Sequence, residues 1–403
     1  MKTYFDNDIP LTIAMWDFSW LQCNHPGGSF QDLAKCVQEA AERGYNTLRV
    51  DVFPHYYLKE THTFPQRGHG RRIRTWGDVL TPGGYTVNVR DKVIELANLC
   101  RKHDIWLGLD TWKSFEIYGH DYRIPPEEEE SFCRNWADTW VNALRLMRED
   151  GILERAAWVA PLNEVPIFLG NLVRRIREDT IPQKEIGDGA IHHLNPHHDP
   201  IFMELNRWLG ESIKAEIERD SIPLLYSGVW VENYPARVPE FYDAVDAHFM
   251  PDAQLTEADR VALEKAGKGA SGFTHHQGMD HWNFALFSAA WERAVRRNYE
   301  AMLENARAFC EKTVETLSSP GGLCFELICT EAYGPCNHPD HEEVDWSWYK
   351  HYNADAARIF ADYPFSGLTL SNHAEPLFSL WQDADWQARG TAYIRTKEFS
   401  GIQ

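Results

Sequence analysis

The sequence lacks any long hydrophobic run, and this absence excludes one class of protein. No stretch of eighteen or more apolar residues occurs in the chain, whereas a helix that spans a bilayer needs about 20 of them. The first residues, 1–8, also lack the apolar core of a secretory signal and already include acidic side chains. We therefore expect a cytoplasmic protein that does not use a membrane as a partner.

Basic side chains are in the minority. The chain has 40 lysines and arginines against 60 aspartates and glutamates, which gives a formal net charge of -20. A chain of this charge repels polyanions, so general nucleic-acid binding is excluded as its main activity. The expected partner is a neutral or small molecule, and the sequence gives no sign of an oligomeric state.

Paired cysteine motifs are also missing. The chain contains 8 cysteines, but no two of them form a Cys-x-x-Cys pair. Several lie within apolar patterns, where a free thiol behaves as a small hydrophobic side chain. We therefore expect structural thiols, with no metal and no cofactor.

The chain does contain short apolar runs that alternate with longer helical patterns, which is typical of a parallel sheet with crossover helices. The runs cover residues 11–17, 47–53, 105–110, 157–164, 223–230, 244–249, 323–331 and 366–370. Helical patterns cover residues 33–41, 88–103, 130–149, 201–219 and 284–317. This α/β alternation predicts a (β/α)8 TIM barrel. Pro161 is an awkward residue for the interior of the fourth strand.

No internal repeat or low-complexity linker divides the chain. We therefore predict a single barrel domain over residues 1–403, with elaborated βα loops. The insertions lie near residues 54–85, 165–200 and 250–282, after predicted strands. Such loops form the active-site face of a (β/α)8 barrel, so the elaborated face is the expected functional face.

Two glutamates stand where predicted strands end. Glu164 closes the fourth strand and Glu331 closes the seventh, and a barrel brings such strand ends to one rim. Cleavage of a glycosidic bond needs one carboxyl group to protonate the leaving oxygen and a second to attack the sugar or activate water. These glutamates are therefore the predicted catalytic residues.

The pattern around these glutamates resembles the clan A retaining glycosidases, the (β/α)8 clan that includes cellulases. The resemblance rests on Asn163-Glu164 and Thr330-Glu331 at the two strand ends and on Arg49 within the second strand. It implies a retaining glycoside hydrolase that cleaves β-glycosidic bonds of oligosaccharides or glycosides by double displacement. Glu164 is then the general acid/base, Glu331 the nucleophile held ionised by Arg49, and Asn163 a ligand of the sugar 2-hydroxyl.

The sixth strand departs from the cellulase-like pattern. A tyrosine commonly supports the nucleophile there, whereas this chain has Asp246-Ala247-His248. We expect His248 to take that role, although a histidine of the core or rim is an equal alternative.

Further residues of the kinds that bind sugars lie at or beyond the predicted strand ends. Sugars present apolar faces and polar edges, so aromatic, carboxylate and charged side chains are expected around them. The predicted binding residues are Arg49, Asp51, Asn163, His248, Trp16, Asp17, Trp112, Trp230, Tyr333 and Trp381. For each aromatic residue, packing in the core is an equally good interpretation.

Two polar segments leave other functions open. The basic run 66–74 could read an anionic sugar, although a solvated loop is the simpler interpretation. A metal-dependent hydrolase on the same fold could use the His-rich loops, which contain His192, His193, His197, His198, His275 and His276. A carbohydrate-binding barrel without catalysis is the other alternative.

Overall fold

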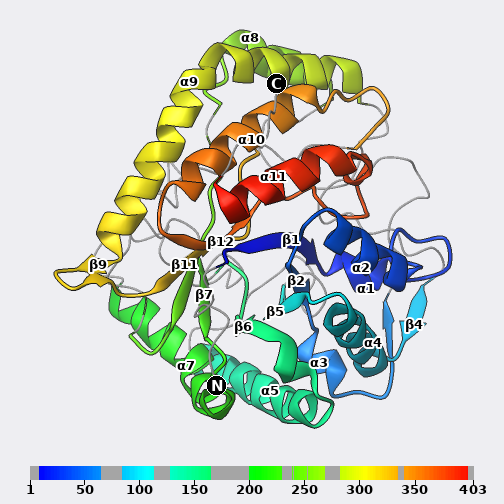
Figure 1. Cartoon of the computed structure of the whole chain (residues 1–403), viewed down its shortest axis with the longest axis vertical. Coiled ribbons are helices and arrows are strands. Elements are labelled where there is room, and N and C mark those ends of the chain that lie inside the picture. The colour runs from blue at the N-terminus through cyan, green and yellow to red at the C-terminus, as the bar shows by residue number, and fades with distance from the viewer. Residues whose placement is uncertain are drawn as a thin grey trace.

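A computed structural model describes the chain over nine ranges: residues 9–64, 84–112, 128–164, 199–228, 238, 240–251, 253–267, 282–334 and 340–397. Eight parallel strands form one sheet, and helices surround it (Figure 1). In chain order the strands are β1 (Leu11–Asp17), β2 (Thr47–Asp51), β5 (Trp106–Asp110), β6 (Ala156–Val159), β7 (Leu225–Gly228), β8 (Ala244–Ala247), β11 (Glu326–Cys329) and β12 (Phe365–Thr369). The predicted (β/α)8 barrel is confirmed.

The two edge strands of this sheet meet, so the sheet curves into a barrel. The strand order is β6-β5-β2-β1-β12-β11-β8-β7, and an isolated parallel bridge joins Val159 at the end of β6 to Leu224 just before β7. The amide of Val159 donates to the carbonyl of Pro223 at 3.0 Å across this seam. All eight carboxyl ends therefore lie around one rim.

Helices follow the strands; those in the five predicted ranges are confirmed, whereas the two after residue 340 were not predicted. The longer ones are α2 (Leu33–Glu42), α4 (Val89–Lys102), α5 (Glu129–Glu149), α7 (Asp199–Ile217), α9 (Phe284–Thr316), α10 (Ser347–Ala361) and α11 (Ala384–Thr396). Side chains cap several of them: Asn88 accepts a hydrogen bond from the amide of Asp91, and Asn283 accepts one from Leu286. Gly44, which follows α2, has φ +80°, a conformation that suits glycine.

The part of the barrel interior near the amino ends of the strands is apolar. Leu11 and Ile13 of β1 pack with Trp158 of β6 and Ile328 of β11, and strands so far apart in the sheet touch only through the interior. Gly108 makes room for the Trp158 ring, because a Cβ there would lie 2.1 Å from its Cζ2 atom. The part of the interior near the carboxyl ends of the strands is polar, with buried Arg49, Asp110 and Asp246.

Most predicted strands differ from the observed ones by one or two residues at an end, and the fourth and seventh differ by three or more. The fourth ends at Val159 rather than at residue 164, because Pro161 cannot continue the hydrogen-bonding ladder. The seventh, predicted over residues 323–331, is wrong at its start. Residues 318–323 instead form a small hairpin of β9 (Ser318–Ser319) and β10 (Gly322–Leu323), whose turn is residues 320–321 and is followed by Gly322 with φ +113°. Only residues 326–329 enter the barrel.

The predicted insertions are described in part. Residues 54–85 include α3 (Pro54–Tyr57) and the hairpin of β3 (His62–Phe64) with β4 (Tyr85–Val87), whereas the basic run 66–74 lies outside the described residues. The insertion near 250–282 contains α8 (Glu257–Lys265), and most of 165–200 is also outside. The assignment of the whole chain to one domain stays a prediction. Among the described helices, none is long and apolar enough to cross a bilayer.

Candidate active site

Glu164 is fixed by contacts with the helix that precedes its strand. The indole nitrogens of Trp136 and Trp140, both on α5, donate to the carbonyl of Pro161 at 2.9 Å each. These bonds hold the segment that ends in Asn163 and Glu164. The backbone of Glu164 is left-handed, with φ +49°. This conformation is costly for a non-glycine residue, and Glu164 shares it with six other non-glycine residues of the described chain.

Glu331 follows β11 and is held by its neighbours on β8. Its carbonyl accepts a hydrogen bond from the amide of Phe249 at 3.0 Å. The preceding residue, Thr330, donates both its amide (2.9 Å) and its hydroxyl (2.6 Å) to the carboxylate of Asp246. These three hydrogen bonds therefore fix the strand end that carries Glu331.

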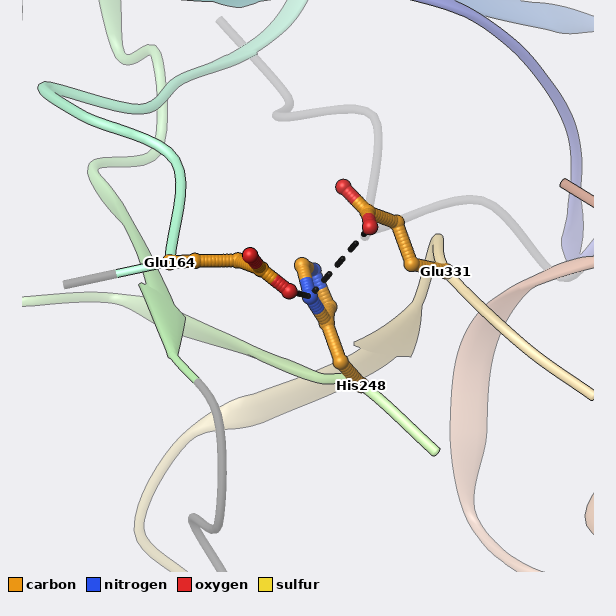
Figure 2. Close-up of side chains that lie close together, drawn as sticks. All are labelled: Glu164, His248 and Glu331. Atoms are coloured by element: carbon orange, nitrogen blue, oxygen red, sulfur yellow. Dashed lines mark hydrogen bonds and ion pairs between the residues drawn. The ribbon is translucent and has the colours of Figure 1, made fainter. Parts of the chain in front are cut away.

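The two glutamates meet at the rim. Carboxylate oxygens of Glu164 and Glu331 and a ring nitrogen of His248 all lie within 4.8 Å of one another, and Figure 2 shows the three side chains converging. The Glu164 side chain is 15% exposed and that of Glu331 is 3% exposed. Glu331 is thus the deeper carboxylate, and Glu164 is the one that solvent reaches.

Arg49 of β2 ties the strand ends together from inside the barrel. Its Nε donates to Asp110 Oδ2 at 2.7 Å, and its Nη1 donates to Glu331 Oε1 at 2.8 Å and to the Thr330 hydroxyl at 2.6 Å. Its Nη2 donates to Asn163 Oδ1. A fully buried guanidinium requires such partners, because an unpaired buried charge is very costly.

His248 lies between the two glutamates. Its Nδ1 is 3.0 Å from Glu164 Oε1 and 3.8 Å from Glu331 Oε2, and its Nε2 is 2.9 Å from Asp246 Oδ2. The structure therefore places His248 beside both glutamates, with the shorter contact to Glu164, whereas its expected role beside Glu331 stays a prediction. It also brings Asp246, which the sequence had not singled out, into contact with the ring.

Burial and charge shift the pKa values of this cluster in different directions. Burial and the nearby charge of Glu164 raise the pKa of Glu331 to about 7, against the opposing effects of His248 and Arg49. Burial alone would lower the pKa of His248, but the charges of Glu331 and Asp246 hold it well above its usual value. Burial also works against ionised Asp246, yet His248 and Arg49 keep its pKa below the usual value.

Asn163, which precedes Glu164, has an unused hydrogen-bond donor among the described residues. Its Oδ1 accepts hydrogen bonds from Arg49 and from the Ser227 hydroxyl, the latter at 3.0 Å. Because arginine can only donate, these bonds orient the amide with Nδ2 on the other side. That buried nitrogen has no partner among the described residues, so a ligand hydroxyl would satisfy it.

Two of the predicted binding residues pack beneath the site instead of opening into it. Asp51 accepts the amides of Phe53 (2.7 Å) and Trp112 (2.8 Å), so its carboxylate fixes two loops. Trp112 is 2% exposed, and its ring lies 4.5 Å from the guanidinium carbon of Arg49, a cation–π contact.

Asp17 ends β1 at the same rim, close enough to Glu331 for their charges to interact. Burial raises its pKa to about 7, and the charge of Glu331 adds to that effect. Its Oδ1 accepts the amide of Ser19, whereas Oδ2 is buried without a partner in the described residues.

The other predicted aromatic residues of the described chain make packing contacts with one another and with the surrounding helices. Trp381 stacks on Tyr45 at 6.0 Å and donates its indole nitrogen to Glu39 of α2 at 2.6 Å, and its ring meets Trp16 edge to face. Tyr333 is fully buried against Phe360 of α10. These contacts are core packing, the alternative interpretation. Trp230 lies outside the described residues.

Sequence reasoning missed four polar residues of the interior. They are Asp110, Ser227, Asp246 and Thr330, each at most 1% exposed. Each lies at or near the carboxyl end of an otherwise apolar strand. That position was the signal that could have found them, since a polar side chain there points to the rim where a barrel site forms.

A trio of a histidine and two carboxylates could hold a metal ion, but its contacts favour a different role. Both ring nitrogens of His248 already lie within hydrogen-bond distance of a carboxylate, and the charges of Glu331 and Asp246 raise the pKa of the ring, which favours its protonated form. A protonated imidazole has no lone pair for a metal. The six histidines of the predicted His-rich loops lie outside the described residues.

Comparisons with known proteins agree with this geometry. A family described as sugar-binding cellulase-like matches residues 13–184, the range that contains Arg49, Asn163 and Glu164. A protein from Parabacteroides distasonis that is proposed to be a glycoside hydrolase has a similar structure, with 23% identity, a TM-score of 0.70, and 97% and 95% of the two chains covered. No curated protein sequence matches the chain.

A more distant structure leads to the same fold. A Bacteroidetes-affiliated GH5 cellulase linked with a polysaccharide utilization locus matches with a TM-score of 0.51 and 11% identity, over 98% of this chain and 95% of the other. The resemblance inferred from the two glutamate motifs is thereby confirmed: the chain has the cellulase-like glycoside hydrolase fold.

Proposed function

We propose that the protein is a retaining glycoside hydrolase that cleaves β-glycosidic bonds of oligosaccharides or glycosides. One observation carries the proposal: the carboxylate oxygens of Glu164 and Glu331 lie within 4.8 Å of each other. Retaining enzymes hold their carboxyl groups about 5 to 5.5 Å apart, whereas inverting enzymes need about 6.5 to 9.5 Å to admit a water between them.

The environments of the two glutamates favour different roles. Glu331 is the nucleophile, because Arg49 donates to Oε1 and orients the carboxylate while leaving Oε2 toward Glu164 and His248. Glu164 is the general acid/base, because it is more exposed and so can meet both the departing group and the incoming water. The unused Nδ2 of Asn163 is a ligand for the sugar 2-hydroxyl.

The alternatives are not favoured. A metal-dependent hydrolase would need a neutral histidine, whereas His248 is held by carboxylates at both nitrogens. A carbohydrate-binding barrel without catalysis would not need two converging carboxylates, one of them with its pKa raised to about 7.

Substitution of the two glutamates by glutamine tests the proposal. Glu331→Gln should abolish turnover of every aryl glycoside that the wild type cleaves. Glu164→Gln should lose about 10²- to 10⁴-fold on substrates with poor leaving groups, because their departure depends on the acid. Glu60→Gln, which changes an exposed carboxylate, is the matched control. Activity would be followed by release of the aryl group, and folding by circular dichroism.

A fluorosugar should label the nucleophile. Incubation with a fluoroglycoside followed by peptide mass spectrometry should locate the sugar on Glu331. Labelling of a different residue, or unchanged turnover by Glu331→Gln, would contradict the assignment.

A further inference from the structure

The shorter contact of His248 is with Glu164. Its Nδ1 lies 3.0 Å from Glu164 Oε1, within hydrogen-bond distance, and 3.8 Å from Glu331 Oε2. Figure 2 shows the ring between the two carboxylates with both contacts drawn. A residue that served only the nucleophile would have the opposite preference.

Asp246 decides where the ring carries its hydrogens. Its Oδ1 accepts the amide of Thr330 at 2.9 Å, and its Oδ2 accepts both the Thr330 hydroxyl at 2.6 Å and the His248 Nε2 at 2.9 Å. An ionised carboxylate can only accept, so Nε2 carries a hydrogen permanently. The exchangeable proton of the ring is therefore the one on Nδ1, which faces Glu164.

We propose that His248 shares with Glu164 the proton that Glu164 delivers to the departing glycosidic oxygen, with Asp246 anchoring the ring. The inference rests on the proposed glycosidase function and deepens it. His248 is a positioning residue in this scheme, because it acts on the substrate only through Glu164.

The proton balance closes over the two steps. In the first, a Glu331 oxygen forms a bond to the anomeric carbon, the glycosidic bond breaks, and the leaving oxygen takes the proton held by the Glu164–His248 pair. Glu164 is then ionised and the His248 ring is neutral. In the second, water attacks the anomeric carbon, the bond to Glu331 breaks, and the proton that the water loses returns to the pair.

The charges around the ring support retention of this proton at neutral pH. The groups that face or adjoin His248 are Glu164 after β6, Glu331 after β11 and Asp246 on its own strand, and Arg49 of β2 contacts the latter two. Three carboxylates and one other cation thus surround it. The pKa of His248 is held well above its usual value as a result.

The test compares leaving groups. His248→Asn places an amide donor near the Nδ1 position and so keeps a hydrogen bond to Glu164, but it cannot release a proton. On the phenyl glycoside of a sugar that the wild type cleaves, it should lose about 10²-fold or more in kcat/KM. On the dinitrophenyl glycoside, whose departure needs no acid, the loss should be less than about tenfold. Glu164→Gln should show the same split.

Equal losses on both substrates would overturn the inference, because they would mean that His248 serves Glu331 or the fold. If the wild type and Glu60→Gln cleave neither substrate, the proposed function itself is wrong. Asp246→Asn is a second variant in case His248→Asn does not fold. Asparagine has the same shape as aspartate but no charge to stabilise the protonated His248 ring. We therefore expect a larger loss of kcat/KM on the phenyl glycoside than on the dinitrophenyl glycoside, with a smaller difference than in His248→Asn.

A spectroscopic readout does not depend on activity. Nitrogen chemical shifts of the His248 ring should show a protonated imidazole at neutral pH in the wild type and a neutral one in Asp246→Asn. A wild-type ring that is neutral at this pH would also overturn the proposal.

Discussion

Glu331 combines burial with a negative neighbour, and its raised pKa should be visible in the pH dependence of the rate. In the proposed mechanism Glu331 reacts as the carboxylate, and burial raises its pKa to about 7. The value of kcat/KM should therefore fall about tenfold per pH unit on the acid side of an apparent midpoint near that value. Because the groups are coupled, the midpoint belongs to the whole cluster.

The cause of the shift can be checked with Glu164→Gln. Removing the negative charge of Glu164, which raises the pKa of Glu331, should move the acid-side midpoint to lower pH. The measurement uses a dinitrophenyl glycoside, so that the variant still turns over. A midpoint that does not move would show that burial alone sets the pKa.

At the level of single elements, the packing of β5 against β6 depends on the absence of a side chain at Gly108. Gly108 of β5 faces the Trp158 ring of β6 inside the barrel, where a Cβ would lie 2.1 Å from the ring. Gly108→Ala should therefore destabilise the fold by about 1 to 3 kcal/mol, the usual cost of overpacking. Chemical denaturation would measure it.

A second substitution distinguishes overpacking from a backbone effect. A Phe ring is smaller than an indole, so Trp158→Phe should recover part of the loss when it is combined with Gly108→Ala. A double-mutant cycle with no coupling between the two positions would contradict the packing explanation.

The elements differ in how far the sequence specified them. The strand core of β2 and the helix α5 were predicted nearly to their ends, because apolar periodicity marks them directly. The start of β11 was not, because residues 323–331 read as one run in the sequence, whereas Leu323 pairs in the β9–β10 hairpin and β11 begins only at Glu326. Periodicity does not reveal where such a run leaves the sheet.

Over the whole molecule, the sequence predicted which strand ends bring the two glutamates together better than it predicted which other side chains lie beside them. Glu164 and Glu331 follow from their places after the fourth and seventh strands. The contacts of Trp381 and Tyr333 with α2 and α10 depend on how helices pack against the barrel. No spacing in the sequence encodes that packing, so core and site aromatics looked alike.

The closed barrel also explains why the polar cluster can exist at all. Arg49, Asp110 and Asp246 are fully buried, and their side chains come from β2, β5 and β8. Only a ring of strands brings these three to one point. The apolar layer around Trp158 lies nearer the amino ends of the strands. One end of the interior therefore supplies apolar packing, and the other end holds the charged residues of the proposed site.

The left-handed backbone at Glu164 is expected to lower the melting temperature of the protein, although the proposed mechanism needs a glutamate at this position. Asparagine tolerates φ +49° better than glutamate or glutamine, and such strain costs on the order of 1 to 3 kcal/mol. Glu164→Asn should therefore unfold at a higher temperature than Glu164→Gln, although both lack the acid; scanning calorimetry would compare them. Equal melting temperatures would contradict this reasoning. A library selected for thermal survival alone should accordingly drift away from glutamate at this position, and its survivors would be sturdier barrels without an acid catalyst.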